Sequence, residues 1–329
     1  FGGLMIAYFA MNEISGGQGV IAGFRMAVEQ VPDKFDLILS KDNPHYASLP
    51  GISVLVGGMW IMNLSYWGFN QYIIQRALAA KNSREAQKGI IFAAFLKMLM
   101  PVLVVLPGIA AVILAPDLSA PDQAYPEIMK LLPAGLTGLV FAALIAAIMS
   151  SLASMMNSIS TIFTMDIYAD LTKVKKTESQ LVTVGRLVSL SAIVLASIIA
   201  RPLRGNFDQA FQYIQEFTGF FTPGIVVIFL LAMFWKKATA NAAIAVAISS
   251  AVISLALKLL WPALPFIDRV GLVFLLCAVI GLAVSHFEGG VEQPGAIEYK
   301  EIDTTTSASF NLASAVIVLM LAGLYATWW

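Results

Sequence analysis

The sequence predicts an all-α protein that crosses a lipid bilayer many times. Of its 329 residues, 59% are hydrophobic and only 12% are charged, whereas soluble domains carry about 25% charged residues. Apolar runs of about 20 residues, the length that a helix needs to cross a bilayer, recur along the whole chain. Unpaired backbone groups are costly in hydrocarbon, which favours helices. The 20 basic and 20 acidic residues balance, so the net charge does not suggest nucleic acid as a partner.

The apolar runs define the order of the spans. Residues 1–13 are interpreted as the end of a truncated transmembrane helix, and residues 14–50 as an extracellular loop in which GFRMAVEQ predicts a short helix. A polar cytoplasmic linker is expected near residues 287–308. Eight complete spans are predicted near residues 51–79, 88–115, 135–167, 182–201, 207–235, 239–262, 269–286 and 309–328.

Basic residues predict the direction of these spans, because short cytoplasmic loops are enriched in Lys and Arg. Three loops, each two crossings from the next, are basic and are therefore predicted to be cytoplasmic. Arg201, Arg204 and Arg269 are exceptions, since they lie on the predicted outer side, but they do not reverse the count. The three basic groups are Arg76, Lys81, Arg84 and Lys88; Lys173, Lys175 and Lys176; and Lys236 and Lys237.

Polar residues interrupt the first complete span, in NLSYWGFNQYIIQR. Asn63, Tyr66 and Asn70 would share one face of a regular helix. Transporters bind substrates at broken helices near the bilayer midplane, and amide and phenol groups beside aromatic rings suit a neutral polyhydroxy ligand. Alternatively, Asn63 forms one interhelical hydrogen bond and the later polar residues approach cytoplasmic water. The glycines at which such a helix can open are Gly57, Gly58 and Gly68.

Three more polar residues lie inside apolar runs. Lys97 is the one charged residue in GIIFAAFLKMLMPVLVVLPG, and a lysine at the bilayer centre costs about 2.5–3.5 kcal/mol. We therefore expect Lys97 to face a cavity or a partner, although its stem could also reach the cytoplasmic interface. In FQYIQEFTGFFTPG, Gln215 could complete a ligand pocket. Glu216 could instead join helices or pair with a lysine.

Small and hydroxylated residues form a stripe in the span near 135–167. In AAIMSSLASMMNSIS, Ala147, Ser150 or Ser151, Ser154 and Ser158 recur at steps of three and four residues. Such a stripe can serve close packing between helices. It can also bind sodium, because hydroxyls and freed carbonyls supply neutral oxygen ligands to a hard cation.

Other classes of protein receive less support. The chain contains no G-x-x-x-x-G-K-[ST] motif, so direct use of ATP is not expected. A single cysteine, Cys277, excludes a disulfide within the chain. The acid pairs Asp166 with Asp170 and Asp117 with Asp122 could bind magnesium in an intramembrane prenyltransferase, but the predicted topology places them on opposite faces. A sensor with a similar membrane part would need a soluble domain. We therefore expect a protein that is not an enzyme.

Three stretches resemble the sodium:solute symporter family, and within it the glucose and galactose carriers: WGFNQYIIQRALAAKNSREAQKGIIFAAFLK, FAALIAAIMSSLASMMNSISTIFTMDIYADL and FQYIQEFTGFFTPGI. The resemblance covers nearly the whole chain. It implies a LeuT-like core of two inverted five-helix repeats in the plasma (inner) membrane, in which sodium binds before a neutral sugar. The second repeat, residues 51–235, would be complete and the first largely absent. Residues 236–329 would form three additional helices.

The resemblance also implies site residues. It makes Asn63, Tyr66, Lys97 and Gln215 sugar ligands, with Lys97 as a hydrogen-bond donor. It makes Ala147 a sodium ligand through its carbonyl, and Ser150 and Ser151 sodium ligands through their hydroxyls. The first repeat would supply the other half of both sites. A sodium symporter of another small solute, such as an inositol or a sialic acid, stays open as an alternative.

Overall fold

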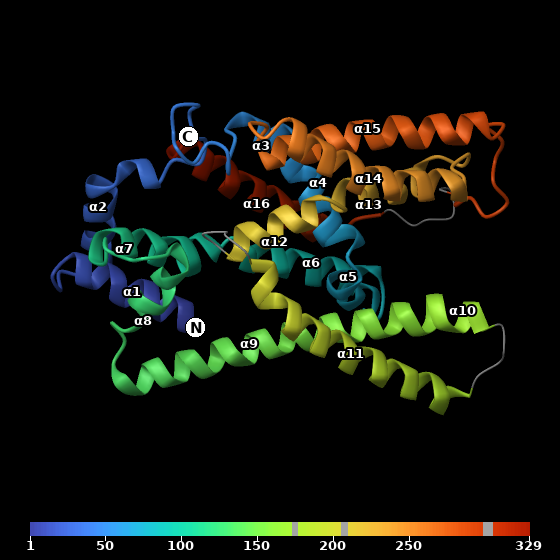
Figure 1. The fold of residues 1–329 in the computed structure, drawn as a ribbon. Coiled ribbons are helices and arrows are strands. Elements are labelled where there is room, and N and C mark those ends of the chain that lie inside the picture. The colour runs from blue at the N-terminus through green and yellow to red at the C-terminus, as the bar shows by residue number, and fades with distance from the viewer. Residues whose placement is uncertain (173–176, 205–209, 299–304) are drawn as a thin grey trace. The chain divides into compact units, whose positions relative to one another are not determined.

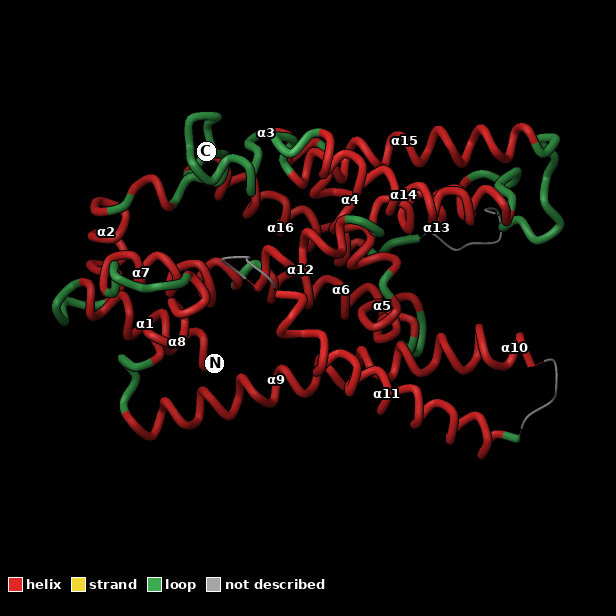
Figure 2. The backbone as a smooth tube through the Cα atoms, viewed as in Figure 1, coloured by secondary structure: helices red, strands yellow, loops and turns green. Residues whose placement is uncertain are grey.

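The computed structural model describes residues 1–172, 177–204, 210–298 and 305–329. These residues form helices and loops without any strand (Figure 2), which confirms the all-α prediction. Within these ranges, six helices are long and apolar enough to cross a membrane, and a bent pair can supply a seventh span. The chain is therefore a multi-pass membrane protein. The basic loop with Lys173, Lys175 and Lys176 lies outside the described residues, as does part of the predicted linker, residues 299–304.

The helices fall into two compact units. The first unit comprises Phe1–Lys34, Gln71–Arg76 and Phe95–Ala210. Its longest helices, α9 (Ala134–Thr161) and α11 (Glu178–Arg204), pack side by side (Figure 1). Its other elements are α1 (Gly2–Ile14), α2 (Val20–Gln30), the short helix η1 (Pro32–Lys34), the π-helical turn η3 (Pro101–Val105), α7 (Leu106–Leu114), the short helix η4 (Pro121–Gln123), α8 (Ala124–Met129), the π-helical turn η5 (Ile162–Tyr168) and α10 (Ala169–Thr172).

The second unit comprises Phe35–Asn70, Ala77–Ala94 and Phe211–Trp329. Its core lies where α13 (Thr222–Phe234), α14 (Ala240–Leu260) and α15 (Phe266–Phe287) meet. Val227, Val246, Val273 and Cys277 are buried together there. The unit also contains α3 (Ile52–Val56), α4 (Gly58–Leu64), the π-helical turn η2 (Ser65–Phe69), α12 (Ala210–Gly219) and α16 (Ala308–Thr327). Both α5 (Gln71–Leu78) and α6 (Ser83–Lys97) are divided between the two units.

The predicted span at residues 51–79 is a broken helix. It consists of α3, α4, η2 and α5, none of which is long enough to cross a membrane alone. The first break is at Gly57, whose φ and ψ are −127° and −125°, and the second is at Asn70, which is extended. Opening at glycine was expected for this stretch, and the structure confirms it at Gly57. The predicted span at 207–235 is likewise divided, because α12 and α13 are bent by 45°.

The end of the chain contacts the loop before α3. The backbone N–H of Leu37 donates a hydrogen bond to the carbonyl oxygen of Trp328 at 2.8 Å. The rings of Phe35 and Trp328 lie 4.9 Å apart. Trp328 immediately follows the last turn of α16, so this contact fixes the end of that helix against the loop.

Candidate functional site

Asn63 and Tyr66 lie on the broken segment, in α4 and η2. The side-chain amide of Asn63 donates a hydrogen bond to the carbonyl oxygen of Met59 at 2.9 Å. Tyr66 is 41% exposed. The ring of Phe69, at the end of η2, stacks on the ring of Phe229 with 4.6 Å between their centroids. This stack attaches the π-helical turn to α13, and π-helical turns within helices often occur at functional sites.

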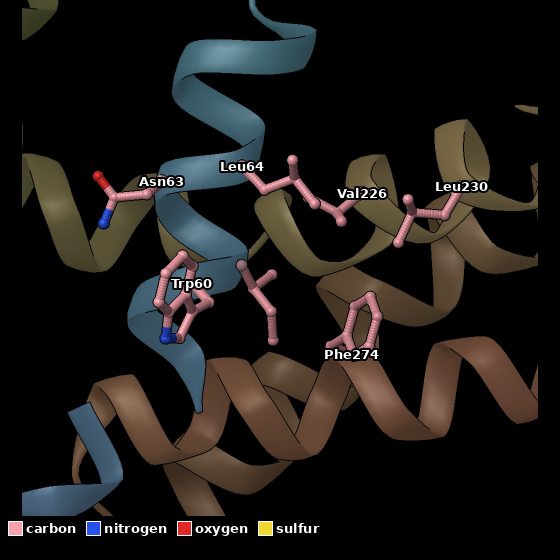
Figure 3. Close-up of a pocket in the computed structure, with 7 residues that line it drawn as sticks. Trp60, Asn63, Leu64, Val226, Leu230 and Phe274 are labelled. Carbon is pink, nitrogen blue, oxygen red and sulfur yellow. The ribbon is translucent and has the colours of Figure 1, made fainter. Parts of the chain in front are cut away.

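A pocket of about 330 Å³ lies between α4, α13 and α15. Its lining residues are apolar except for one amide: Trp60, Ile61, Asn63, Leu64, Val226, Leu230 and Phe274. Figure 3 shows that the side chain of Asn63 points away from Leu230 and Phe274. Neither Tyr66 nor Gln215 lines this pocket. It is therefore an apolar cavity beside the broken helix, and it does not gather the polar residues that the sequence predicted to bind a sugar.

Gln215 and Glu216 lie on α12, where Gln215 is half-buried. The carboxylate oxygen Oε1 of Glu216 accepts hydrogen bonds from Lys258 Nζ at 2.7 Å and from Arg269 Nη2 at 3.1 Å. Both alternatives for Glu216 hold, since it pairs with a lysine and joins helices. The Arg269 side chain is only 7% exposed, so this ion pair also accounts for a charge that was an exception to the predicted topology.

Lys97 is the last residue of α6, and its side chain belongs to the first unit. It lies near the middle of the candidate span Ser83–Leu114 and is exposed. The three other predicted sugar ligands belong to the second unit. The assignment of Lys97 to the same site as those residues stays a prediction.

The predicted sodium ligands Ala147, Ser150 and Ser151 lie on consecutive turns of α9 and are exposed. The helix is continuous from Ala134 to Thr161, so no carbonyl is freed by a break there. The carbonyl of Ala147 could bind a cation only with the lone pair that the helical hydrogen bond leaves over. The three residues provide a row of oxygens on one helix, and their role as a sodium site stays a prediction.

A hydrogen-bond network that the sequence reasoning missed lies next to these residues. Arg76 Nη2 donates to Ser154 Oγ at 2.6 Å, and Ser154 Oγ donates to the carbonyl oxygen of Ser150 at 3.1 Å. The amide of Asn157 donates to Gln75 Oε1 at 3.3 Å. In the sequence, Arg76 was used only as one of the basic residues that predict a cytoplasmic loop. No sequence pattern indicates which helix its side chain would contact. The network ties α5 to the stripe on α9.

The structure gives no support to an acid-based metal site within the residues that it describes. No group of three or more His, Cys, Asp or Glu side chains comes together there. The acid pairs that suggested a magnesium-dependent prenyltransferase therefore do not combine into one cluster in the described part of the chain.

Comparison with known proteins assigns the family. Residues 1–249 match the model of the sodium:solute symporter family. The chain is 45% identical over 347 aligned positions to a sodium/glucose cotransporter of Vibrio parahaemolyticus, covering 100% of this chain and 64% of that protein. It is 40% identical over 215 positions to the human sodium/myo-inositol cotransporter 2, covering 59% of this chain and 31% of the relative. It is 33% identical over 270 positions to a bovine sodium/mannose cotransporter, covering 74% of this chain and 45% of that relative.

The chain thus spans less than two thirds of the length of each of these relatives. The family match itself extends from the first residue through α1 to α13 and into α14, and it includes every predicted site residue. With a match of this extent, the chain belongs to the sodium:solute symporter family.

Proposed function

We propose that this chain is part of a sodium-coupled secondary active symporter that carries a neutral sugar, such as glucose or galactose, across the plasma (inner) membrane. The observation that carries the proposal is the 45% identity, along the whole chain, to a sodium/glucose cotransporter. Relatives named for myo-inositol and mannose support the same class of solute, because all three are neutral polyhydroxy compounds. On this proposal the chain is part of a carrier and not of an enzyme.

The proposed sugar ligands are Asn63, Tyr66, Gln215 and Lys97. Amide groups donate and accept hydrogen bonds, so Asn63 and Gln215 match sugar hydroxyls, which do both. Lys97 only donates, and its position near the middle of a span is compatible with a site at half depth. The broken helix that carries Asn63 and Tyr66 supports this assignment, because breaks expose polar backbone groups where a cavity receives them.

The proposed coupling ion is sodium, bound by the carbonyl of Ala147 and the hydroxyls of Ser150 and Ser151. Neutral oxygen ligands suit this hard monovalent cation. Residues 51–235 would form one five-helix repeat of an inverted pair, with residues 236–329 as additional helices. The sodium gradient would favour an outward-open state, sugar binding would permit occlusion, and the bundle would rock about the central site.

Sodium-driven uptake tests the sugar ligands. Vesicles containing the full-length protein should accumulate labelled glucose or galactose only with an inward sodium gradient. Asn63→Ala and Gln215→Ala should each abolish this uptake, whereas Asn311→Ala, the same change at an exposed residue of α16, should not. Unchanged uptake in the first two variants would remove both residues from the site.

The sodium site needs a separate measurement. Ser151→Ala should raise the sodium concentration for half-maximal uptake. Ser197→Ala, at an exposed serine of α11 whose hydroxyl donates to Ile193 of the same helix, should leave it unchanged. Equal sodium dependence in the two variants would place the cation elsewhere.

The alternative substrate is an inositol, favoured by 40% identity to the sodium/myo-inositol cotransporter 2. Competition against labelled glucose distinguishes the two. If unlabelled myo-inositol inhibits uptake at lower concentrations than glucose or galactose, the carrier is an inositol symporter.

A further inference from the structure

The bend between α12 and α13 is held by a residue from a third helix. In a continuous helix the carbonyl of Phe220 would accept a hydrogen bond from the N–H of Gly224, four residues later. Here the hydroxyl of Ser250, on α14, lies between these two groups. It donates to the carbonyl oxygen of Phe220 at 2.8 Å and accepts from the N–H of Gly224 at 3.0 Å. One side-chain hydroxyl thus replaces one helical hydrogen bond, and insertion of a side chain into the ladder is a known cause of kinks.

Ser250 is completely buried, and its neighbour must be glycine. The exposed fraction of Ser250 is 0%. A Cβ atom added at Gly224 would lie 2.6 Å from Ser250 Cβ, too close for any other residue. The hydroxyl therefore has both its donor and its acceptor function used in one defined place. The hydrogen bonds of Ser250 thus hold the 45° bend between α12 and α13 in one defined geometry.

A second contact fixes α12, the first helix of the pair. Glu216 is held by Lys258 on α14 and Arg269 on α15. Directly after the end of α12, the ring of Phe220 lies 5.7 Å from Lys258 Nζ and 5.5 Å from Arg269 Cζ, within the range of cation–π attraction. Glu216, in the last turn of α12, and Phe220, just beyond its end, contact the same two cations. This end of α12 is thereby bound to α14 and α15, which sets the rotation of α12 about its axis.

These two contacts determine where Gln215 lies. Gln215 directly precedes Glu216, so its side chain leaves α12 about 100° around the axis from the side chain of Glu216. It is five residues from Phe220, or about 7.5 Å at helical rise. Loss of the 45° bend would displace it by about 6 Å, far more than a hydrogen bond tolerates.

We propose that Ser250, together with the ion pair of Glu216 with Lys258 and Arg269, positions α12 so that Gln215 meets the transported solute. The proposal rests on the proposed role of Gln215 in binding that solute. On this proposal α14 and α15 contribute to solute binding by holding α12 in place, although all four proposed ligands lie on other elements.

Ser250→Ala tests the bend directly. A buried polar group left unpaired is costly. Without the hydroxyl, the carbonyl of Phe220 and the N–H of Gly224 can both be paired only by a hydrogen bond to each other, and that bond straightens the helix. The matched control is Ser254→Ala, one turn later on α14. Ser254 is equally buried, but its hydroxyl has no hydrogen-bond partner among the described residues.

The readout is a distance measured in the full-length protein. Spin labels are attached at Phe211→Cys on α12 and Leu275→Cys on α15, both exposed; Cys277 is kept because it is buried. Ser250→Ala should change the distance between the labels by several ångströms and raise the sugar KM at least tenfold. The sodium concentration for half-maximal uptake should stay unchanged. Ser254→Ala should change neither. Glu216→Gln, which keeps an acceptor but loses the charge, should raise the sugar KM by a smaller factor than Ser250→Ala does. Glu85→Gln, at an exposed ion pair, should leave the sugar KM unchanged.

The outcomes separate this proposal from the one on which it rests. An unchanged label distance in Ser250→Ala overturns the positioning role, whatever the transport rate. A changed distance with an unchanged sugar KM overturns instead the role of Gln215 as a ligand. If Ser250→Ala fails to fold, Glu216→Gln measured with the same label pair decides, and an unchanged distance and KM there refute the positioning role.

Discussion

Replacing Gly58 with Ala should force α4 away from α15. A Cβ at this position would lie 1.9 Å from the carbonyl oxygen of Ile267, whereas real Cβ atoms essentially never approach closer than 3.0 Å. The obstructing atom belongs to the backbone, so a side-chain rotation cannot relieve the clash. The two helices must separate by about 1 Å. Overpacking in a well-packed core costs about 1–3 kcal/mol, and a contact between two backbones belongs at the upper end of that range.

The displacement should also affect the proposed site. Asn63 is carried by the same helix, five residues after Gly58, and an error of about 1 Å in a positioned group can cost about a hundredfold in rate. Thermal unfolding of the purified full-length protein gives the stability, and sodium-driven sugar uptake gives the functional effect. Gly58→Ala should lower the unfolding midpoint and the uptake rate together.

The matched control is Gly138→Ala, in the interior of α9. A Cβ there would meet nothing within 4 Å, and alanine is favoured over glycine in a helix by about 1 kcal/mol. This variant should be as stable as the wild type or more so. If Gly58→Ala unfolded at the same temperature as Gly138→Ala, the close contact between α4 and α15 would be refuted.

Three further predictions concern the second unit. Thr239→Ala should lower the free energy of unfolding by about 1 kcal/mol, because the Thr239 hydroxyl caps α14 by accepting from the N–H of Ala242 at 3.2 Å; equal thermal stability would exclude this cap. Phe69→Ala should reduce sugar uptake more than Phe69→Tyr, which retains the stacked ring on Phe229; equal uptake would exclude a role for the stack. The pKa of Glu288 is lowered by side-chain hydrogen bonds, first from Thr239, so its stabilising effect is present above its ordinary pKa and lost as the pH falls through the lowered value. The difference in unfolding midpoint between wild type and Glu288→Gln should therefore shrink on acidification, and a constant difference would contradict the shift.

The sequence predicted the long helices well because their signal is local. A run of apolar residues of sufficient length specifies a span whatever its neighbours are, and the helices Ala240–Leu260 and Ala308–Thr327 agree with the predicted spans 239–262 and 309–328 within two residues. The break at Gly57 was also predictable, since a glycine pair shortly before a polar stretch is a recognisable signal within one segment.

The contacts between helices could not be predicted in the same way. The role of Ser250 depends on α14 lying against the bend of α12 and α13, and no spacing within AISSAVISL indicates that neighbour. Arg269 contradicted the charge rule until its contact with Glu216 was known. The π-helical form of η2 likewise has no residue signature, because it results from the local winding of the backbone. The proposed ligands were chosen by polarity, and that property does not say which helices bring them together.

The hydrogen bond between Leu37 and Trp328 limits how often the chain can pass through the bilayer. Two residues in direct contact share one side of the membrane, so the number of passages between them is even. Within the described residues, the six long helices and the bent pair would give seven passages. We therefore predict that the broken segment from α3 to α5 forms one more passage, which makes the number even. A single labelling measurement with a membrane-impermeant thiol reagent on Trp328→Cys would then fix the sidedness of every loop.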